Sequence, residues 1–235
     1  MYRLRTYHPE KVIYVVGSEQ KLHFQQLFTV LKLGGWNNDN FVHVDFGLFR
    51  FPEGKMSTRK GRLIFLEDVL EKAISQAEKI IEEKNPSLAN KKEVAKVVGV
   101  GAIIFGDLSS DRIRDVDFDW NRMLSFEGET GPYLQYTHAR ACSILRKAGL
   151  KKKKSAKISF KLLSSAQELA LVKDLSLFPN ILVTAAQSYK PHHLAQYLIR
   201  LAQKFNDFYH SCQVISEDKD LMQARLVLVD AVRQV

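Results

Sequence analysis

The first third of the chain alternates apolar and amphipathic segments in a way that predicts a strand–helix–strand unit. Residues 12–16 are continuously apolar and mostly β-branched, which is typical of a strand buried on both faces. Ser18 is placed to cap a helix that begins near Glu19 and ends at Gly34. Residues 42–48 alternate with period two, which predicts a second strand. We expect four apolar side chains of the helix to face a core: Leu22, Leu27, Val30 and Leu31.

Beyond residue 65 every recognisable element is helical. Hydrophobic periodicity predicts helices over about 67–84, about 92–105 and 132–148. Ser165 and Glu168 form a capping-box pattern at the start of a further helix. Two prolines stand where first-turn prolines belong: Pro179 and Pro191.

These patterns predict an α/β fragment, Rossmann-like but partial, followed by a mostly α-helical bundle, so that the whole is mainly α. We place the α/β part at 1–65, a helical connecting segment at 66–125 and the bundle at 126–235. One strand–helix unit cannot form a stable parallel sheet alone, and the apolar helix that reaches Val235 carries no stop signal. We therefore expect a portion of a longer protein, truncated at its C-terminus.

The amino-acid composition predicts an anionic partner. The formal net charge is +9 over 235 residues, which favours binding to nucleic acid, although many soluble proteins are basic. The two cysteines, Cys142 and Cys212, stand far apart and have no metal-ligand spacing. We find no apolar run long enough to span a bilayer and no signal peptide, so we expect a cytoplasmic protein with no membrane partner.

The segment from Gly54 to Gly61 carries the clearest chemical signal. Lys55, Arg59 and Lys60 place three cations in a glycine-bracketed run. Such a run suits the binding of phosphate oxygens and the stabilisation of charge on a departing pyrophosphate. The alternative is a solvated basic turn between a strand and a helix.

Three blocks in a fixed order extend this signal: residues 14–28, residues 43–61 with Phe46-Gly47-Leu48 ahead of the Lys-Met-Ser run, and residues 126–140. In these blocks the chain resembles the C-terminal portion of the arginyl-tRNA synthetase family, which belongs to class I. The resemblance covers nearly the whole chain. It implies that arginine and ATP form arginyl-adenylate and pyrophosphate, and that arginine is then transferred to tRNA(Arg). The implied partners are tRNA(Arg), ATP and L-arginine, with Mg²⁺ bound through the ATP phosphates, no protein-ligated metal and no DNA.

The resemblance also assigns roles in the α/β part. Lys55 and Ser57 match the family's loop motif, in which Met56 also contacts ATP. Many class I enzymes have a second lysine where this chain has Thr58, so Arg59 or Lys60 is expected to supply that charge. The family's nucleotide-side histidine matches His23, and its arginine-pocket glutamine matches Gln20. Without the family, Gln20 would be interpreted as a surface residue and His23 as a half-buried histidine.

The bundle resembles the family's anticodon-binding domain, which reads unpaired bases by stacking and by edge hydrogen bonds. Tyr209 is the leading stacking candidate, although Phe205, Phe208 and Tyr209 also form an aromatic stripe typical of a core. Arg140 has the alternative role of an ion-pair partner for Glu127 or Glu129. The tRNA-binding candidates are Tyr133, Tyr136, His138, Arg140, Asn206 and Tyr209.

The sequence lacks the His-Ile-Gly-His-type signature that class I synthetases need. We therefore expect that this chain alone binds tRNA but does not activate arginine. Two other interpretations remain: a non-catalytic tRNA-binding module, and a fragment of cysteinyl-tRNA synthetase. The second would require zinc-ligand cysteines and a different sequence at Gln20–His23.

Overall fold

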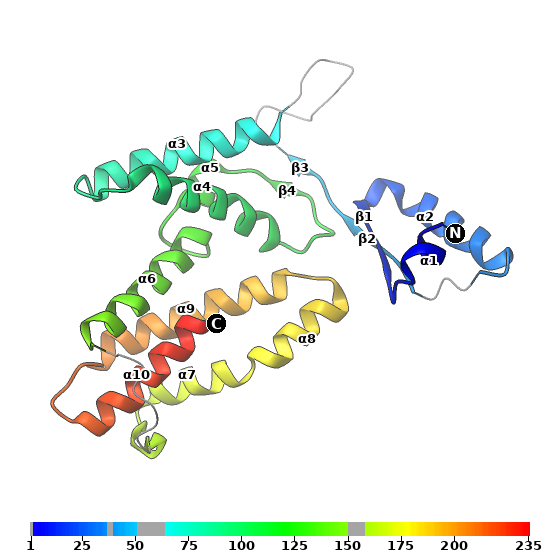
Figure 1. Ribbon diagram of the computed structural model, residues 1–235. Helices are drawn as coiled ribbons and strands as arrows, with labels where there is room; N and C mark the ends of the chain where they lie inside the picture. Colours follow the sequence, from blue (N-terminus) through cyan, green and yellow to red (C-terminus); the bar gives the residue numbers. More distant parts are fainter. Residues whose placement is uncertain (1, 37–39, 51–63, 150–157) are drawn as a thin grey trace. The chain divides into compact units, whose positions relative to one another are not determined.

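The computed structural model describes residues 2–36, 40–50, 64–149 and 158–235 (Figure 1). It contains two compact units, one α/β unit (Met1–Arg62 with Ser110–Asp119) and one helical unit (Leu63–Ser109 with Trp120–Val235). The expected fold class is confirmed, because small parallel sheets are followed by a mainly helical remainder. The three-part division at residues 65 and 125 stays a prediction.

The α/β unit is built on a short parallel pair of strands. β1 and β2 run side by side from the Val12–Phe41 pair to the Gly17–Phe46 pair, with a helix connecting them, as expected for a βαβ crossover. The elements of this part are α1 (Tyr2–Tyr7), β1 (Val12–Gly17), the 3₁₀ turn η1 (Ser18–Gln20), α2 (Lys21–Leu33) and β2 (Phe41–Phe46).

The packing of α2 differs from the sequence prediction. Ser18 begins the 3₁₀ turn rather than capping a helix, and α2 starts at Lys21 without a side-chain cap. In α2, Phe24 is buried and stacks on His43, while Leu22 and Val30 are each 64% exposed. The prediction was therefore wrong for Leu22 and Val30, because aromatic contacts under the sheet decide which face is buried. The other two predicted positions, Leu27 and Leu31, are half-buried.

A second parallel pair joins β3 (Phe49–Arg50) to β4 (Val116–Asp117), so the expectation of only helices beyond residue 65 was wrong. Gly47 permits this pairing, because a Cβ there would lie 2.4 Å from the carbonyl oxygen of Arg114. The Asp115 carboxylate accepts hydrogen bonds from the Leu48 amide at 2.9 Å and from Arg50 at 2.6 Å. A segment far along the chain thus completes the small sheet.

The helical unit begins with a tightly packed helix pair, α3 and α4. Gly99 of α4 allows the close approach, since a Cβ there would lie 2.7 Å from the backbone nitrogen of Ile74. The predicted helices are confirmed with small shifts at their ends. The elements are α3 (Leu66–Lys84), α4 (Lys91–Leu108), α5 (Trp120–Leu124), α6 (Gly131–Lys147), η3 (Phe160–Leu162), α7 (Ala166–Ser176), α8 (Phe178–Ser188), α9 (His192–Ser211) and α10 (Lys219–Gln234).

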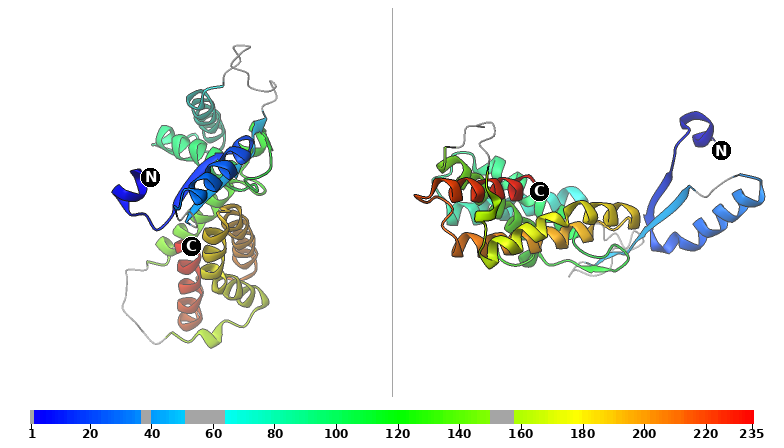
Figure 2. Two further views of the ribbon diagram at one scale, coloured as in Figure 1. Left: turned by 90° about the vertical axis from the view of Figure 1, so that its right-hand side faces the viewer. Right: turned by 90° about the horizontal axis from the view of Figure 1, so that it is seen from below.

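The bundle core lies where α6, α7, α9 and α10 meet, and Figure 2 shows α9 running alongside α8. The capping box at Ser165 and Glu168 is confirmed, as is the first-turn position of Pro179 in α8. Pro191 is the N-cap of α9, just before the first turn. The fully buried side chains at the centre include Leu171, Tyr197, Phe205, Phe208 and Val229.

Residues Ala166–Ser188 are apolar and long enough by composition to span a membrane, with a mean hydropathy of 1.4 and 11% of the window buried. No such run was predicted from the sequence. The stretch is divided into α7 and α8, which meet at Leu177. It also contains Asp174, whose carboxylate is 2% exposed and pairs with Arg200 and Lys204. A buried aspartate that pairs with two cations of another helix is unfavourable for insertion into lipid, so this one stretch is weak evidence for a span.

Candidate nucleic-acid interface

The start of α6 positions a row of polar and aromatic side chains. The Thr130 hydroxyl accepts a hydrogen bond from the Tyr133 amide at 3.2 Å, and a proline occupies the first turn. From this start, Tyr136 and Arg140 follow four residues apart, so they share a face of the helix. On α9, Asn206 and Tyr209 lie three residues apart and meet this face.

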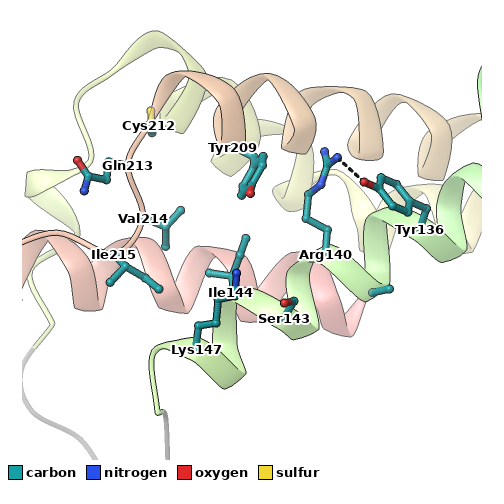
Figure 3. Close-up of a pocket in the computed structure, with 11 residues that line it drawn as sticks. Tyr136, Arg140, Ser143, Ile144, Lys147, Tyr209, Cys212, Gln213, Val214 and Ile215 are labelled. Atoms are coloured by element: carbon teal, nitrogen blue, oxygen red, sulfur yellow. Dashed lines mark hydrogen bonds between the residues drawn. The ribbon is translucent and has the colours of Figure 1, made fainter. Parts of the chain in front are cut away.

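Arg140 is at the centre of the contact between the two helices. Its guanidinium carbon lies 4.8 Å from the ring centroid of Tyr136 and 4.8 Å from that of Tyr209. Figure 3 shows the guanidinium group between the two rings. One nitrogen donates to the Tyr136 hydroxyl at 3.2 Å, and another donates to the Asn206 side-chain oxygen. Arg140 therefore contacts Asn206 and the tyrosines rather than Glu127 or Glu129.

Asn206 joins both helices through its amide group. Its nitrogen donates to the Tyr133 hydroxyl at 2.7 Å and lies 3.4 Å from the Thr137 hydroxyl oxygen, while its oxygen accepts from Arg140. Both the nitrogen and the oxygen of this amide thus form hydrogen bonds within the protein. In this arrangement Asn206 orients the guanidinium of Arg140 and the ring of Tyr133.

Beside this cluster is an open pocket of about 570 Å³. Tyr136 and Tyr209 border it with 51% and 40% of their surfaces exposed, and Arg140 and Lys147 supply positive charge. Exposed aromatic rings can stack on unpaired bases, and neighbouring cations can bind the phosphates of the same strand. The pocket is also lined by Ala139, Ser143, Ile144, Cys212, Gln213, Val214 and Ile215, all of which except Ala139 are labelled in Figure 3.

The structure thus brings Tyr133, Tyr136, Arg140, Asn206 and Tyr209 together, and leaves His138 apart. His138 is exposed and its Nε2 lies 3.3 Å from the Cys142 sulfur. It lines a different cavity of about 150 Å³, mostly apolar, with Leu198 and Val235. The His138 ring therefore faces away from the cluster on α6.

Sequence reasoning did not identify Lys147 or residues 212–215 as part of the pocket. Lys147 is seven residues after Arg140, so helical spacing alone places it on the same face. Residues 212–215 are the first part of the connection from α9 to α10, and no local pattern indicates that they close a pocket beside α6. Lys147 could have been found from the sequence, whereas residues 212–215 could not.

In the α/β unit, Gln20 and His23 follow the carboxyl end of β1, which is where ligands collect in parallel sheets. Both side chains are exposed, and the His23 ring packs edge-on against Phe24 with centroids 5.5 Å apart. The loop candidates lie outside the described residues: Lys55, Met56, Ser57, Arg59 and Lys60.

An ion pair that the sequence did not indicate lies near the carboxyl end of β2. Arg112 Nη1 lies 2.8 Å from the Asp45 carboxylate and also contacts the Asp45 carbonyl oxygen. This hydrogen bond outweighs burial and lowers the pKa of Asp45 below its usual value. The stabilisation is therefore present at neutral pH and is lost as the pH falls through the lowered pKa. Across the described residues, no group of three or more His, Cys, Asp or Glu side chains is arranged to hold a metal ion.

Comparisons with known proteins identify a synthetase catalytic domain in the first half of the chain and an anticodon-binding domain in the second half. Residues 1–120 match the family described as "tRNA synthetases class I (R), catalytic domain", and residues 134–235 match the "DALR anticodon binding domain". The chain is 48% identical over 237 aligned positions to arginine–tRNA ligase from Halothermothrix orenii, covering 100% of this chain and 41% of that protein. It thus spans about two-fifths of that relative's length.

Solved structures give the same result. Arginyl-tRNA synthetase from Thermus thermophilus superposes with a TM-score of 0.86 at 35% identity, covering 96% of this chain and 38% of that one. The enzyme from Plasmodium falciparum superposes with a TM-score of 0.80 at 26% identity, covering 99% and 40%. The catalytic-domain family that matches is the one for arginine, marked (R). This match does not favour the alternative that the chain is a fragment of cysteinyl-tRNA synthetase. The chain belongs to the arginyl-tRNA synthetase family of class I synthetases.

Proposed function

We propose that this chain is part of an arginine–tRNA ligase, which uses ATP to form arginyl-adenylate and then transfers arginine to tRNA(Arg). The observation that carries the proposal is the presence of catalytic-domain sequence and anticodon-domain sequence in one chain, in the family's order. The 48% identity to a relative named arginine–tRNA ligase supports the same activity. A non-catalytic tRNA-binding module would explain the bundle but not the catalytic-domain match over residues 1–120.

In this proposal the α/β unit binds the two small substrates, arginine and ATP. Gln20 would accept a hydrogen bond from the arginine guanidinium, and His23 would lie beside the nucleotide, as the resemblance implies. Lys55 and Ser57, with Met56, would cover the ATP phosphates, and Arg59 or Lys60 would add the second charge. Mg²⁺ would be held through the ATP phosphates. Exposure of Gln20 and His23 at the end of β1 supports their availability to ligands.

The pocket between α6 and α9 would take an unpaired anticodon base. Tyr209 and Tyr136 offer exposed ring faces, and Lys147 offers a cation for the adjoining phosphate. Arg140, held by Asn206, would keep the two tyrosines apart and oriented. Contacts within the protein would therefore orient Arg140 and the two rings before a base binds.

We expect Tyr209→Ala to weaken binding of tRNA(Arg) to this chain by about 1–3 kcal/mol, roughly 5- to 150-fold in Kd, because a stacking platform is lost. The melting temperature should stay close to that of the unchanged chain, since the Tyr209 ring is 40% exposed. Filter binding and thermal unfolding measure the two quantities.

The matched control is Phe160→Ala, which removes another exposed aromatic ring of the helical unit, from η3 outside the pocket. This control should leave tRNA affinity unchanged. A large drop in melting temperature for Tyr209→Ala would instead assign Tyr209 to the core, and unchanged affinity would remove it from the tRNA interface.

A further inference from the structure

One wall of the pocket is made by residues 212–215, the first part of the segment that connects α9 to α10, called the link below. Its members line the pocket across from the α6 side chains Ser143 and Lys147 (Figure 3). Cys212 still donates its amide to the Phe208 carbonyl of α9 at 2.8 Å, but residues 213–215 lie beyond the helix. Contacts from other elements must therefore hold them in place.

Cys212 and Val214 of this link are buried in the bundle core, and Arg225 of α10 adds a side-chain hydrogen bond to its backbone. Arg225 Nη1 donates to the backbone carbonyl of Gln213 at 2.8 Å, and Arg225 Nε donates to Glu168 Oε1 at 2.7 Å. The Arg225 side chain is 14% exposed and that of Glu168 is 1% exposed. One rigid guanidinium thus joins the pocket wall to a buried carboxylate at the start of α7.

Glu168 is itself fixed by the beginning of α7. Its Oε2 accepts hydrogen bonds from the backbone amides of Ser164 at 2.9 Å and Ser165 at 2.8 Å. The Ser165 hydroxyl lies 3.4 Å from the sulfur of Cys212, which is the first residue of the link. The link is therefore held at two neighbouring residues by a network that spans α7 and α10.

The charge on Glu168 is consistent with this network. Burial alone would raise the pKa of Glu168, but the hydrogen bonds from Arg225 and Ser165 together lower it below its usual value. Glu168 is thus ionised at neutral pH, and its buried charge depends on Arg225. A substitution that loosens Arg225 acts on the whole network rather than on one hydrogen bond.

We propose that Arg225 is a positioning residue for nucleotide recognition: it ties the Gln213 carbonyl to Glu168 and so holds residues 212–215 as the preformed wall of the base pocket. Arg225 does not line the pocket, and its effect on a bound base passes through the link. A preformed wall lowers the ordering cost of binding and sharpens the choice of base. This inference rests on the proposed anticodon-reading function of the pocket.

The test uses Arg225→Lys, which keeps the positive charge but cannot reproduce the two bonds made by separate guanidinium nitrogens. We expect the backbone amide of Cys212, which donates to the Phe208 carbonyl at 2.8 Å, to exchange with solvent about tenfold faster, with the interiors of α9 and α10 unchanged. We also expect the preference for tRNA(Arg) over the same tRNA with a replaced anticodon to fall about threefold. The matched control is Arg233→Lys on the same helix, whose arginine pairs with Asp230 at 2.7 Å.

The possible outcomes distinguish failure of the positioning role of Arg225 from failure of the proposed function of the pocket. Unchanged exchange and unchanged anticodon preference in Arg225→Lys would overturn the positioning role while the base pocket stands. Faster exchange throughout α9 and α10 with a lower melting temperature would also overturn it, because the role would then be structural only. If the unchanged chain shows no anticodon preference, the proposed function of the pocket fails and the inference falls with it.

Discussion

Phe208→Ala is expected to destabilise the helical unit by about 3–5 kcal/mol, the usual loss for truncating a buried phenylalanine. The Phe208 ring is 0% exposed, lies 6.2 Å from the ring of Phe205 and belongs to the bundle core. Removing it leaves a cavity between helices that cannot fully close. Thermal or urea unfolding followed by circular dichroism measures the loss.

The neighbouring Tyr209→Ala is the control for this experiment, since it also removes an aromatic ring from the same turn of α9. The two changes should separate cleanly, with Phe208→Ala lowering stability and Tyr209→Ala lowering tRNA affinity. Equal loss of stability in both variants would show that the aromatic stripe is core throughout.

In a complete synthetase that contains this chain, Lys55→Ala is expected to slow arginyl-adenylate formation by roughly 10²–10³-fold. This estimate follows the cost of removing one donor that stabilises transition-state charge, about 2.7–4 kcal/mol. The reason is electrostatic, because negative charge develops on the pyrophosphate as it leaves. ATP–pyrophosphate exchange in the presence of arginine and tRNA measures the rate.

Lys32→Ala provides the comparison for Lys55→Ala, because it removes an exposed lysine from the last turn of α2. It should leave the exchange rate unaltered. Neutralising Lys55, Arg59 and Lys60 together with no loss of rate would end the assignment of this loop to pyrophosphate.

Local patterns predicted the parts of the candidate site that lie on single helices. The four-residue spacing from Tyr136 to Arg140 and the three-residue spacing from Asn206 to Tyr209 each place side chains on one helix face. The structure brings these faces together through the Arg140–Asn206 hydrogen bond, between residues 66 positions apart. Helical periodicity is a short-range property, so it was reliable for each face.

The missed features depend on contacts between distant residues. Asp45 pairs with Arg112 across 67 positions, and Arg225 binds Glu168 across 57. The parallel pairing of β3 with β4 likewise joins separate segments of the chain. No local propensity indicates such partners, and the same is true of the face of α2, where contacts with Tyr14 and His43 decided which residues are buried.

The most direct test of the central claim compares two ligands on the unchanged chain. Equilibrium binding is measured for tRNA(Arg) and for the same tRNA with its anticodon replaced, at one salt concentration because phosphate contacts make affinity salt-dependent. If the pocket between α6 and α9 takes an anticodon base, the altered tRNA should bind about tenfold more weakly, which corresponds to about 1.4 kcal/mol. Equal affinity for the two tRNAs would contradict the claim.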